Sequence, residues 1–166
     1  MHHRIASFLL GCWILGSLFM MFVATGNFKI ADAAQDAHTR QLLRLMAGQA
    51  NQMFFLTWEL AQIILAAALA GLFFFGVGSR LLASLSTALL LVTVSQHFWI
   101  TPEMVALTAQ LDSAASANRF AMLHAVYGVL EVLKLLIALV IAGILLPAWK
   151  TRHRNVAELQ PIHDSR

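Results

Sequence analysis

Eight polar side chains lie inside stretches of this 166-residue sequence that are otherwise apolar. They are Glu59, Gln62, Gln96, His97, His124, Tyr127, Glu131 and Lys134. Carboxylates, imidazoles and amines are the groups that hold and transfer protons, and imidazole with carboxylate is also a common ligand set for transition metals. Because an ionisable group in apolar surroundings is costly without a polar partner, these residues are the candidates for an intramembrane functional site.

Four of the eight residues share one face of a predicted helix. At about 100° per residue, with His124 taken as zero, Tyr127 lies near 300°, Glu131 near 340° and Lys134 near 280°. Glu131 and Lys134 are three residues apart, a spacing that lets two charged side chains pair on a helix. One hypothesis is a proton or ion relay through this pair. The other is an internal ion pair that only orients the helix.

Glu59, His97 and His124 are expected at a similar depth, about 5–10 Å inside one end of their helices at 1.5 Å per residue. One hypothesis is a metal site with two imidazoles and one carboxylate. A second is a haem b with His97 and His124 as axial ligands. The alternative is that both histidines only form hydrogen bonds with other helices. The cofactor therefore stays open between a metal ion, haem b and none.

Four long apolar stretches must position these residues. Hydrophobic residues make up 60% of the chain and charged residues 11%, against about 45–50% and about 25% in soluble domains. A helix that crosses the hydrocarbon core needs roughly 20 apolar residues. Residues 5–24, 53–77, 81–100 and 120–146 meet this requirement. We predict an all-α polytopic membrane protein with a single four-transmembrane-helix bundle over residues 1–166.

Basic residues near the ends of the spans predict the orientation. We interpret residues 5–24 as a membrane helix, because this stretch is longer than the apolar region of a signal peptide. Four spans leave both termini on one side, where Lys150, Arg152 and Arg154 directly follow the fourth span. Because basic flanks favour the cytoplasmic side, both termini are expected in the cytoplasm, with residues 147–166 as a basic tail.

Small residues predict how the spans pack. Ala66 and Ala70 share a face with Glu59 and form a small-xxx-small pattern, which lets a neighbouring backbone approach. The simplest packing places this face of the second span against the polar face of the fourth. Gly11 and Gly16 are predicted as packing notches on the first span.

The connections are predicted to be partly helical. Residues 39–50 have apolar side chains at helical spacing, and they either lie on the membrane interface or extend the second span. Thr101, Pro102 and Glu103 are typical of a helix start, with a cap, a proline and an early acid, which predicts a new short helix to about residue 111. Residues 112–118 are predicted as the turn into the fourth span.

Two segments resemble a known family. Residues 101–107 (TPEMVAL) follow the third span, and residues 119–124 (RFAMLH) open the fourth. The pattern resembles a bacterial family of four-span membrane proteins of unknown function that includes transmembrane protein 205-like proteins. The resemblance implies the four-span topology and no chemistry. Its family-type positions here are Thr101, Pro102, Phe120, Leu123 and His124.

Three functional hypotheses remain open. The chain is a small transport or metal-handling protein built around the polar site, an accessory subunit of a larger membrane complex, or a b-type haem electron carrier; its protein partners would be other membrane subunits or further copies of itself in a homo-oligomer. The expected location is the bacterial inner (cytoplasmic) membrane. The net charge of +3 comes without a nucleic-acid motif, so the expected partners are lipid and membrane subunits and not nucleic acid. No phosphate-binding loop, nucleophile elbow or dinucleotide fingerprint occurs, and we expect no enzyme.

Overall fold

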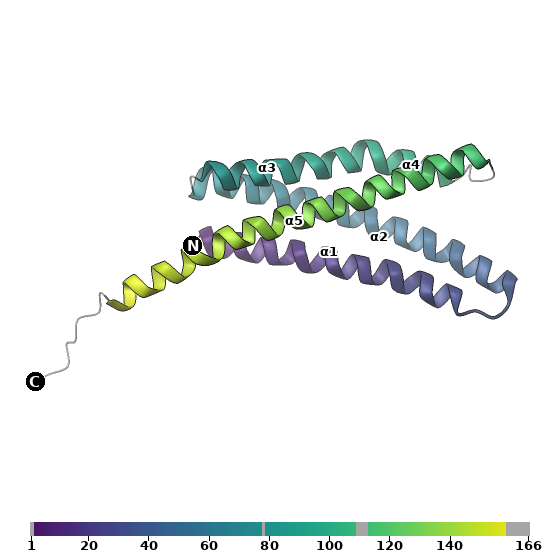
Figure 1. Cartoon of the computed structure of the whole chain (residues 1–166), viewed down its shortest axis with the longest axis horizontal. Coiled ribbons are helices and arrows are strands. Elements are labelled where there is room, and N and C mark those ends of the chain that lie inside the picture. The colour runs from purple at the N-terminus through teal and green to yellow at the C-terminus, as the bar shows by residue number, and fades with distance from the viewer. Residues whose placement is uncertain (1, 78, 109–112, 159–166) are drawn as a thin grey trace, which may run out of the picture.

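The chain forms four long helical rods that run alternately up and down (Figure 1). The computed structural model describes residues 2–77, 79–108 and 113–158, with side chains up to residue 145. Over these ranges the regular elements are α1 (His2–Asp32), α2 (Ala37–Gly71), the π-helical η1 (Leu72–Val77), α3 (Arg80–Ser95), the π-helical η2 (Gln96–Ile100), α4 (Thr101–Thr108) and α5 (Ala114–Glu158). Within the predicted tail, α5 continues to residue 158, and residues 159–166 lie outside the described residues.

The outer surface of the bundle is apolar. Within the described residues four helices are long and apolar enough to cross a membrane, namely residues 2–32, 37–77, 80–108 and 114–145. Large apolar side chains point outward, including Phe22, Phe75 and Val129, which are 78%, 95% and 67% exposed. An apolar surface of this extent is unsuited to water and suits contact with lipid chains. The chain is a multi-pass membrane protein with an all-α four-helix bundle, as its composition predicts.

The four rods form a ring around a common axis. Helix α1 packs against α2 and α5, and α3 packs against the same two helices. Helices α2 and α5 therefore face each other across the axis. The polar faces of the second and fourth spans do meet, as predicted, but through long side chains that reach across the bundle centre.

The interior is divided along its length into an apolar half and a polar half. The apolar half lies nearer the N-terminus and the start of α3, and all four rods contribute side chains to it. Its buried side chains are Ala6, Leu10, Trp13, Ala66, Leu69, Phe73, Leu82, Ala83, Leu89, Ala138, Ile141 and Leu145. The other half of the interior holds the predicted polar residues.

Residues 80–108 are helical without a break, which corrects the predicted new helix at Thr101. In a regular α-helix Pro102 would remove a hydrogen bond and clash with the preceding turn. Here the wide turn of η2 precedes the proline, and the Thr101 N–H donates to the Gln96 carbonyl five residues back. Thr101 has α-helical angles and is not an N-cap. The π-helical turn accommodates the proline, so the helix continues to Thr108.

Both predicted connections differ from the structure in length. Residues 39–50 belong to α2, so they extend the second span and do not form a separate interfacial helix. Asp36 caps α2 by accepting hydrogen bonds from Thr39 N at 2.7 Å and Thr39 Oγ1 at 2.8 Å. These hydrogen bonds hold the pKa of the Asp36 carboxyl below its usual range. In the second connection α5 is already helical from Ala114, and residues 109–112 lie outside the described residues.

Gly16 is a packing notch, as predicted, because the indole of Trp58 lies against it. A Cβ atom at Gly16 would overlap with Cη2 of Trp58. We expect Gly16→Ala to lower the free energy of unfolding by about 1–3 kcal/mol, the usual range for overpacking. Unfolding in detergent, followed by circular dichroism during titration with a denaturing detergent, measures this change.

Gly11 provides the matched control. A Cβ atom there would meet nothing within 4 Å, so the prediction of a notch at Gly11 is wrong. Gly11→Ala should stabilise by roughly 0.5–1 kcal/mol, because alanine loses less conformational freedom in a helix than glycine. Changes of the same sign at Gly11 and Gly16 would contradict the packing described here.

Candidate functional site

Glu59, on α2, is fully buried and has hydrogen-bond partners from three other segments. Its Oε1 accepts from Thr101 Oγ1 at 2.7 Å and from Tyr127 OH at 2.8 Å. Its Oε2 lies 2.9 Å from His97 Nδ1. A carboxylate without water is tolerated when donors surround it, and these three partners supply that environment. The side chains from η2, α4 and α5 therefore converge on one acid.

Lys134 is the second centre of polar contacts. It is fully buried on α5, and its Nζ donates to Glu131 Oε1 and to Gln62 Oε1, each at 2.6 Å. Gln62 Nε2 in turn lies 3.3 Å from Ser17 Oγ on α1. The ion pair predicted from the spacing of residues 131 and 134 is present. It is linked to α1 and α2 by neutral polar side chains.

Gln96 connects the two centres. Its Nε2 lies 3.4 Å from the Tyr127 carbonyl oxygen and 3.5 Å from Glu131 Oε1, both long hydrogen bonds. Through these contacts and the backbone of Tyr127, the group extends from η2 and α4 to α1. We call this group the polar network, and its members are Ser17, Glu59, Gln62, Gln96, His97, Thr101, Tyr127, Glu131 and Lys134.

The ionisable groups of the polar network can balance one another. With Glu59 and Glu131 ionised and with His97 and Lys134 protonated, the charges sum to zero. A proton that moves from His97 Nδ1 to Glu59 Oε2 across 2.9 Å leaves the sum unchanged. Because an uncompensated charge is costly inside a membrane, this internal transfer is favoured over net charging. The Glu59–His97 pair is therefore suited to holding a transferable proton.

Two ionisable side chains of the polar network, His97 and Glu131, are partly exposed. The side chain of His97 is 17% exposed, whereas its partner Glu59 is fully buried. Tyr127 and Thr101 are also buried. An imidazole ring has one nitrogen that donates and one that accepts, so it can pass a proton between two partners. His97 is the partly exposed member next to the buried acid.

The polar network ends at Lys134 along the length of α5. Tyr127 is seven residues, or about 10 Å, nearer the start of α5. Beyond Lys134 the inward positions of α5 are Ala138, Ile141 and Leu145, which belong to the apolar half. The network therefore lies in the half of the bundle away from the N-terminus.

His124 lies apart from the polar network, unlike its predicted place in a ligand set with Glu59 and His97. Its side chain is exposed, and its ring stacks on Phe120 with centroids 6.0 Å apart. The described residues hold no group of three or more His, Cys, Asp or Glu placed to bind a metal ion. The start of α5, which carries His124, packs beside α4 (Figure 1). The geometry therefore gives no support to the metal and haem hypotheses.

Two members of the polar network were not among the predicted site residues. The Thr101-Pro102-Glu103 pattern favours a helix cap at Thr101, and in a regular α-helix residues 96 and 101 do not share a face. The hydrogen bond of η2, which joins residues five apart, brings both to the buried side. Ser17 continues the buried spacing of Leu10 and Trp13 on α1. That spacing was the signal that could have identified Ser17.

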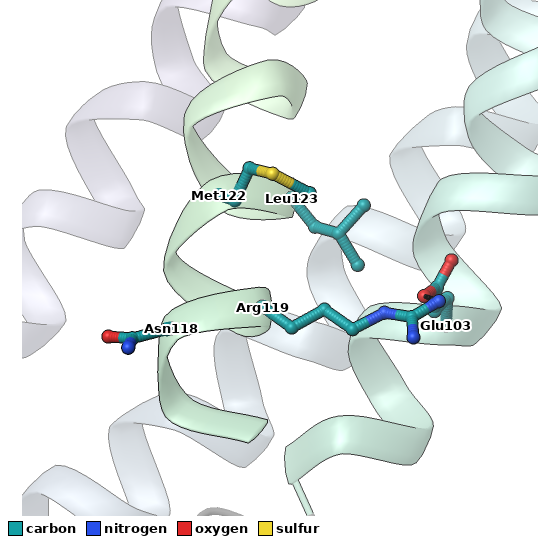
Figure 2. Close-up of a pocket in the computed structure, with 5 residues that line it drawn as sticks. All are labelled: Glu103, Asn118, Arg119, Met122 and Leu123. Atoms are coloured by element: carbon teal, nitrogen blue, oxygen red, sulfur yellow. Dashed lines mark ion pairs between the residues drawn. The ribbon is translucent and has the colours of Figure 1, made fainter. Parts of the chain in front are cut away.

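A surface pocket lies between α4 and α5 (Figure 2). The lining residues are Glu103, Asn118, Arg119, Met122 and Leu123. Arg119 reaches across the pocket to form an ion pair with Glu103. This ion pair joins the start of α5 to α4, and α4 also carries Thr101. The pocket shares no residue with the polar network.

The fold and the polar network define a class: a small multi-pass helical membrane protein with a buried, hydrogen-bonded polar network. Comparison with protein-family models, with curated proteins and with solved structures finds no match for this chain.

Proposed function

We propose that this chain is a small transport protein whose polar network takes up protons from the membrane face opposite the termini. The observation that carries the proposal is the contact of the buried Glu59 with the partly exposed His97. A proton that arrives at His97 can pass to Glu59 along one hydrogen bond. Gln96, which donates to the backbone carbonyl of Tyr127 and to Glu131, lies between this pair and Glu131.

The orientation and location are part of the same proposal. With the basic cluster after the fourth span in the cytoplasm, the face that His97 approaches is the outer face of a bacterial inner membrane. We also propose membership of the four-span family that includes transmembrane protein 205-like proteins, on the strength of its two matching segments. In this orientation the chain takes protons from the more acidic side of an energised membrane.

Proton uptake into vesicles tests the function. Reconstituted protein should collapse an imposed pH gradient, reported by a pH-sensitive dye inside the vesicles. Glu59→Gln and Glu131→Gln should each slow uptake by at least about tenfold, because an amide cannot accept and release the proton as a carboxylate does.

Glu103→Gln is the matched control, because it makes the same chemical change at a carboxylate that pairs with Arg119 outside the polar network. Its uptake should stay at the wild-type rate. Wild-type vesicles that are no faster than protein-free vesicles would refute the proposed function.

A second candidate function, an accessory subunit, is favoured by the length of the α1–α2 hairpin. The second rod spans 41 residues, or about 60 Å at 1.5 Å per residue, which exceeds the full bilayer thickness of about 40–45 Å. Leu42, Leu45 and Met46, near its outer end, are exposed. Co-purification of a stoichiometric partner in mild detergent, together with absent proton uptake, would favour this function.

A further inference from the structure

The surface pocket between α4 and α5 has a charged part and an apolar part (Figure 2). Its volume is about 510 Å³, within the range of about 300–1,000 Å³ that is usual for sites that bind a small molecule. Arg119 of α5 and Glu103 of α4 form an ion pair at the pocket, and Met122 and Leu123 of α5 supply apolar lining. The proposed proton uptake uses none of these residues.

The charged part of the pocket lies nearer the membrane surface than the apolar part. Arg119 directly precedes the apolar stretch that begins at residue 120, and Leu123 is one turn, or about 6 Å, further along α5 into the span. Glu103 is four residues, or about 6 Å, beyond Trp99 on the facing rod, and Trp99 is 71% exposed. Because tryptophan is enriched at the level where lipid headgroups begin, the ion pair lies at that level and the apolar lining faces the acyl chains.

The ion pair leaves a large part of both charged groups accessible to a ligand. The side chains of Arg119 and Glu103 are 63% and 36% exposed. One terminal nitrogen of Arg119 contacts Glu103, whereas a guanidinium carries five N–H donors and a carboxylate accepts through two oxygens. An ion pair as exposed as this one contributes little stability by itself. Stability alone is therefore a weak reason for a cation and an anion beside a cavity.

We propose that this pocket binds the headgroup of a phospholipid that carries a primary ammonium, with Arg119 on the phosphate and Glu103 on the ammonium. A guanidinium matches a phosphate both in charge and in the planar fork of its donors. A primary ammonium donates hydrogen bonds to a carboxylate, whereas a quaternary ammonium has no N–H to donate. An anionic headgroup without an amine offers Glu103 no cation and repels it. The glycerol end of the lipid then lies against Met122 and Leu123.

Competition between lipids for the full chain tests the proposal. The protein is reconstituted in vesicles of equal parts phosphatidylethanolamine, phosphatidylcholine and phosphatidylglycerol, and the lipids that stay bound after gentle release are identified by native mass spectrometry. Phosphatidylethanolamine should be retained about fivefold over phosphatidylcholine, because the two differ in the N–H donors of the amine and an exposed site weakens a charge-assisted hydrogen bond. Phosphatidylglycerol should be retained least. Equal retention of the three lipids by the wild type overturns the proposal without any variant.

Two substitutions separate the two halves of the site. Arg119→Gln should lose most of the bound phospholipid, because the phosphate loses its cation. Glu103→Gln should still bind phospholipid but no longer distinguish phosphatidylethanolamine from phosphatidylcholine, because an amide does not balance the ammonium charge. Arg44→Gln is the matched control, since it makes the same change in the exposed Arg44–Asp32 pair, which does not line the pocket. Its lipid preference should equal that of the wild type.

Two further outcomes would overturn the assignment. A lipid preference that survives in both Arg119→Gln and Glu103→Gln belongs to another surface of the bundle. Soluble phosphoethanolamine, added to lipid-free protein in detergent, should bind weakly because it has nothing to place against the apolar lining. Binding as strong as that of the lipid would show a site for a free phosphate ester. Proton uptake enters none of these outcomes, because the pocket shares no residue with the polar network, so lipid binding can fail while uptake succeeds, and the reverse.

Discussion

Replacing Lys134 by methionine is expected to lower the free energy of unfolding by about 3 kcal/mol. Breaking a buried ion pair by removing one partner costs about 3–5 kcal/mol, because the remaining charge is left uncompensated. The lower end applies because 19% of the Glu131 side chain remains exposed. Removal of the ammonium group also leaves the Gln62 oxygen without its donor. Unfolding in detergent, followed by circular dichroism, measures the loss.

Two further variants test whether this loss comes from the uncompensated charge. In Lys134→Met/Glu131→Gln no charge is left behind, and most of the stability should return. Arg44→Met deletes the cation of an exposed ion pair, in which Arg44 Nε lies 2.5 Å from Asp32 Oδ1. Its effect should be far smaller, since exposed ion pairs contribute little. A double variant as unstable as Lys134→Met alone would show that the loss has another origin.

Replacing Glu59 by leucine is expected to remove at least about 2 kcal/mol, because two buried hydroxyls lose their acceptor at about 1–3 kcal/mol each. These hydroxyls belong to Thr101 and Tyr127, both buried. The imidazole of His97 also loses its partner. We expect Glu59→Leu to unfold at a clearly lower concentration of denaturing detergent than the wild type.

Glu59→Gln separates the shape of the residue from its charge. The amide oxygen can still accept from Thr101 and Tyr127, so this variant should keep most of the stability that leucine loses. The amide nitrogen is a donor, and it would favour the His97 tautomer in which Nδ1 accepts. Nitrogen resonances of the His97 ring should therefore differ between wild type and Glu59→Gln at the same pH. Identical resonances would contradict the contact between His97 and Glu59.

Much of the fold and part of the site can be predicted from the sequence. The amount of apolar sequence and the lengths of the four stretches predict a membrane bundle, because a bilayer leaves few alternatives for a backbone that must satisfy its own hydrogen bonds. The 3.6-residue period predicts that Tyr127, Glu131 and Lys134 share an inward face. Local spacing also predicts the Glu131–Lys134 pair.

Contacts that cross the bundle could not be predicted in the same way. The joining of Glu59 to Thr101 depends on a π-helical turn, and the spacing of residues 96 and 101 in a regular helix argues against it. His124 has the right register for the polar face of α5, yet its side chain is exposed at the level where α5 packs beside α4. The helical period predicts on which face of a helix a side chain lies, but it does not predict whether another helix packs against that face at the same depth.

The sequence by itself determined that this chain crosses a membrane four times and turns an acid, a phenol and an ion pair inward. The tertiary structure decided which of these groups touch, that they form one polar network with Ser17 and Thr101, and that the network fills only half of the bundle. The first set of features is predictable because the apolar content and the helical period are properties of local sequence. A hydrogen bond between helices depends on their relative position and on the shape of a single turn.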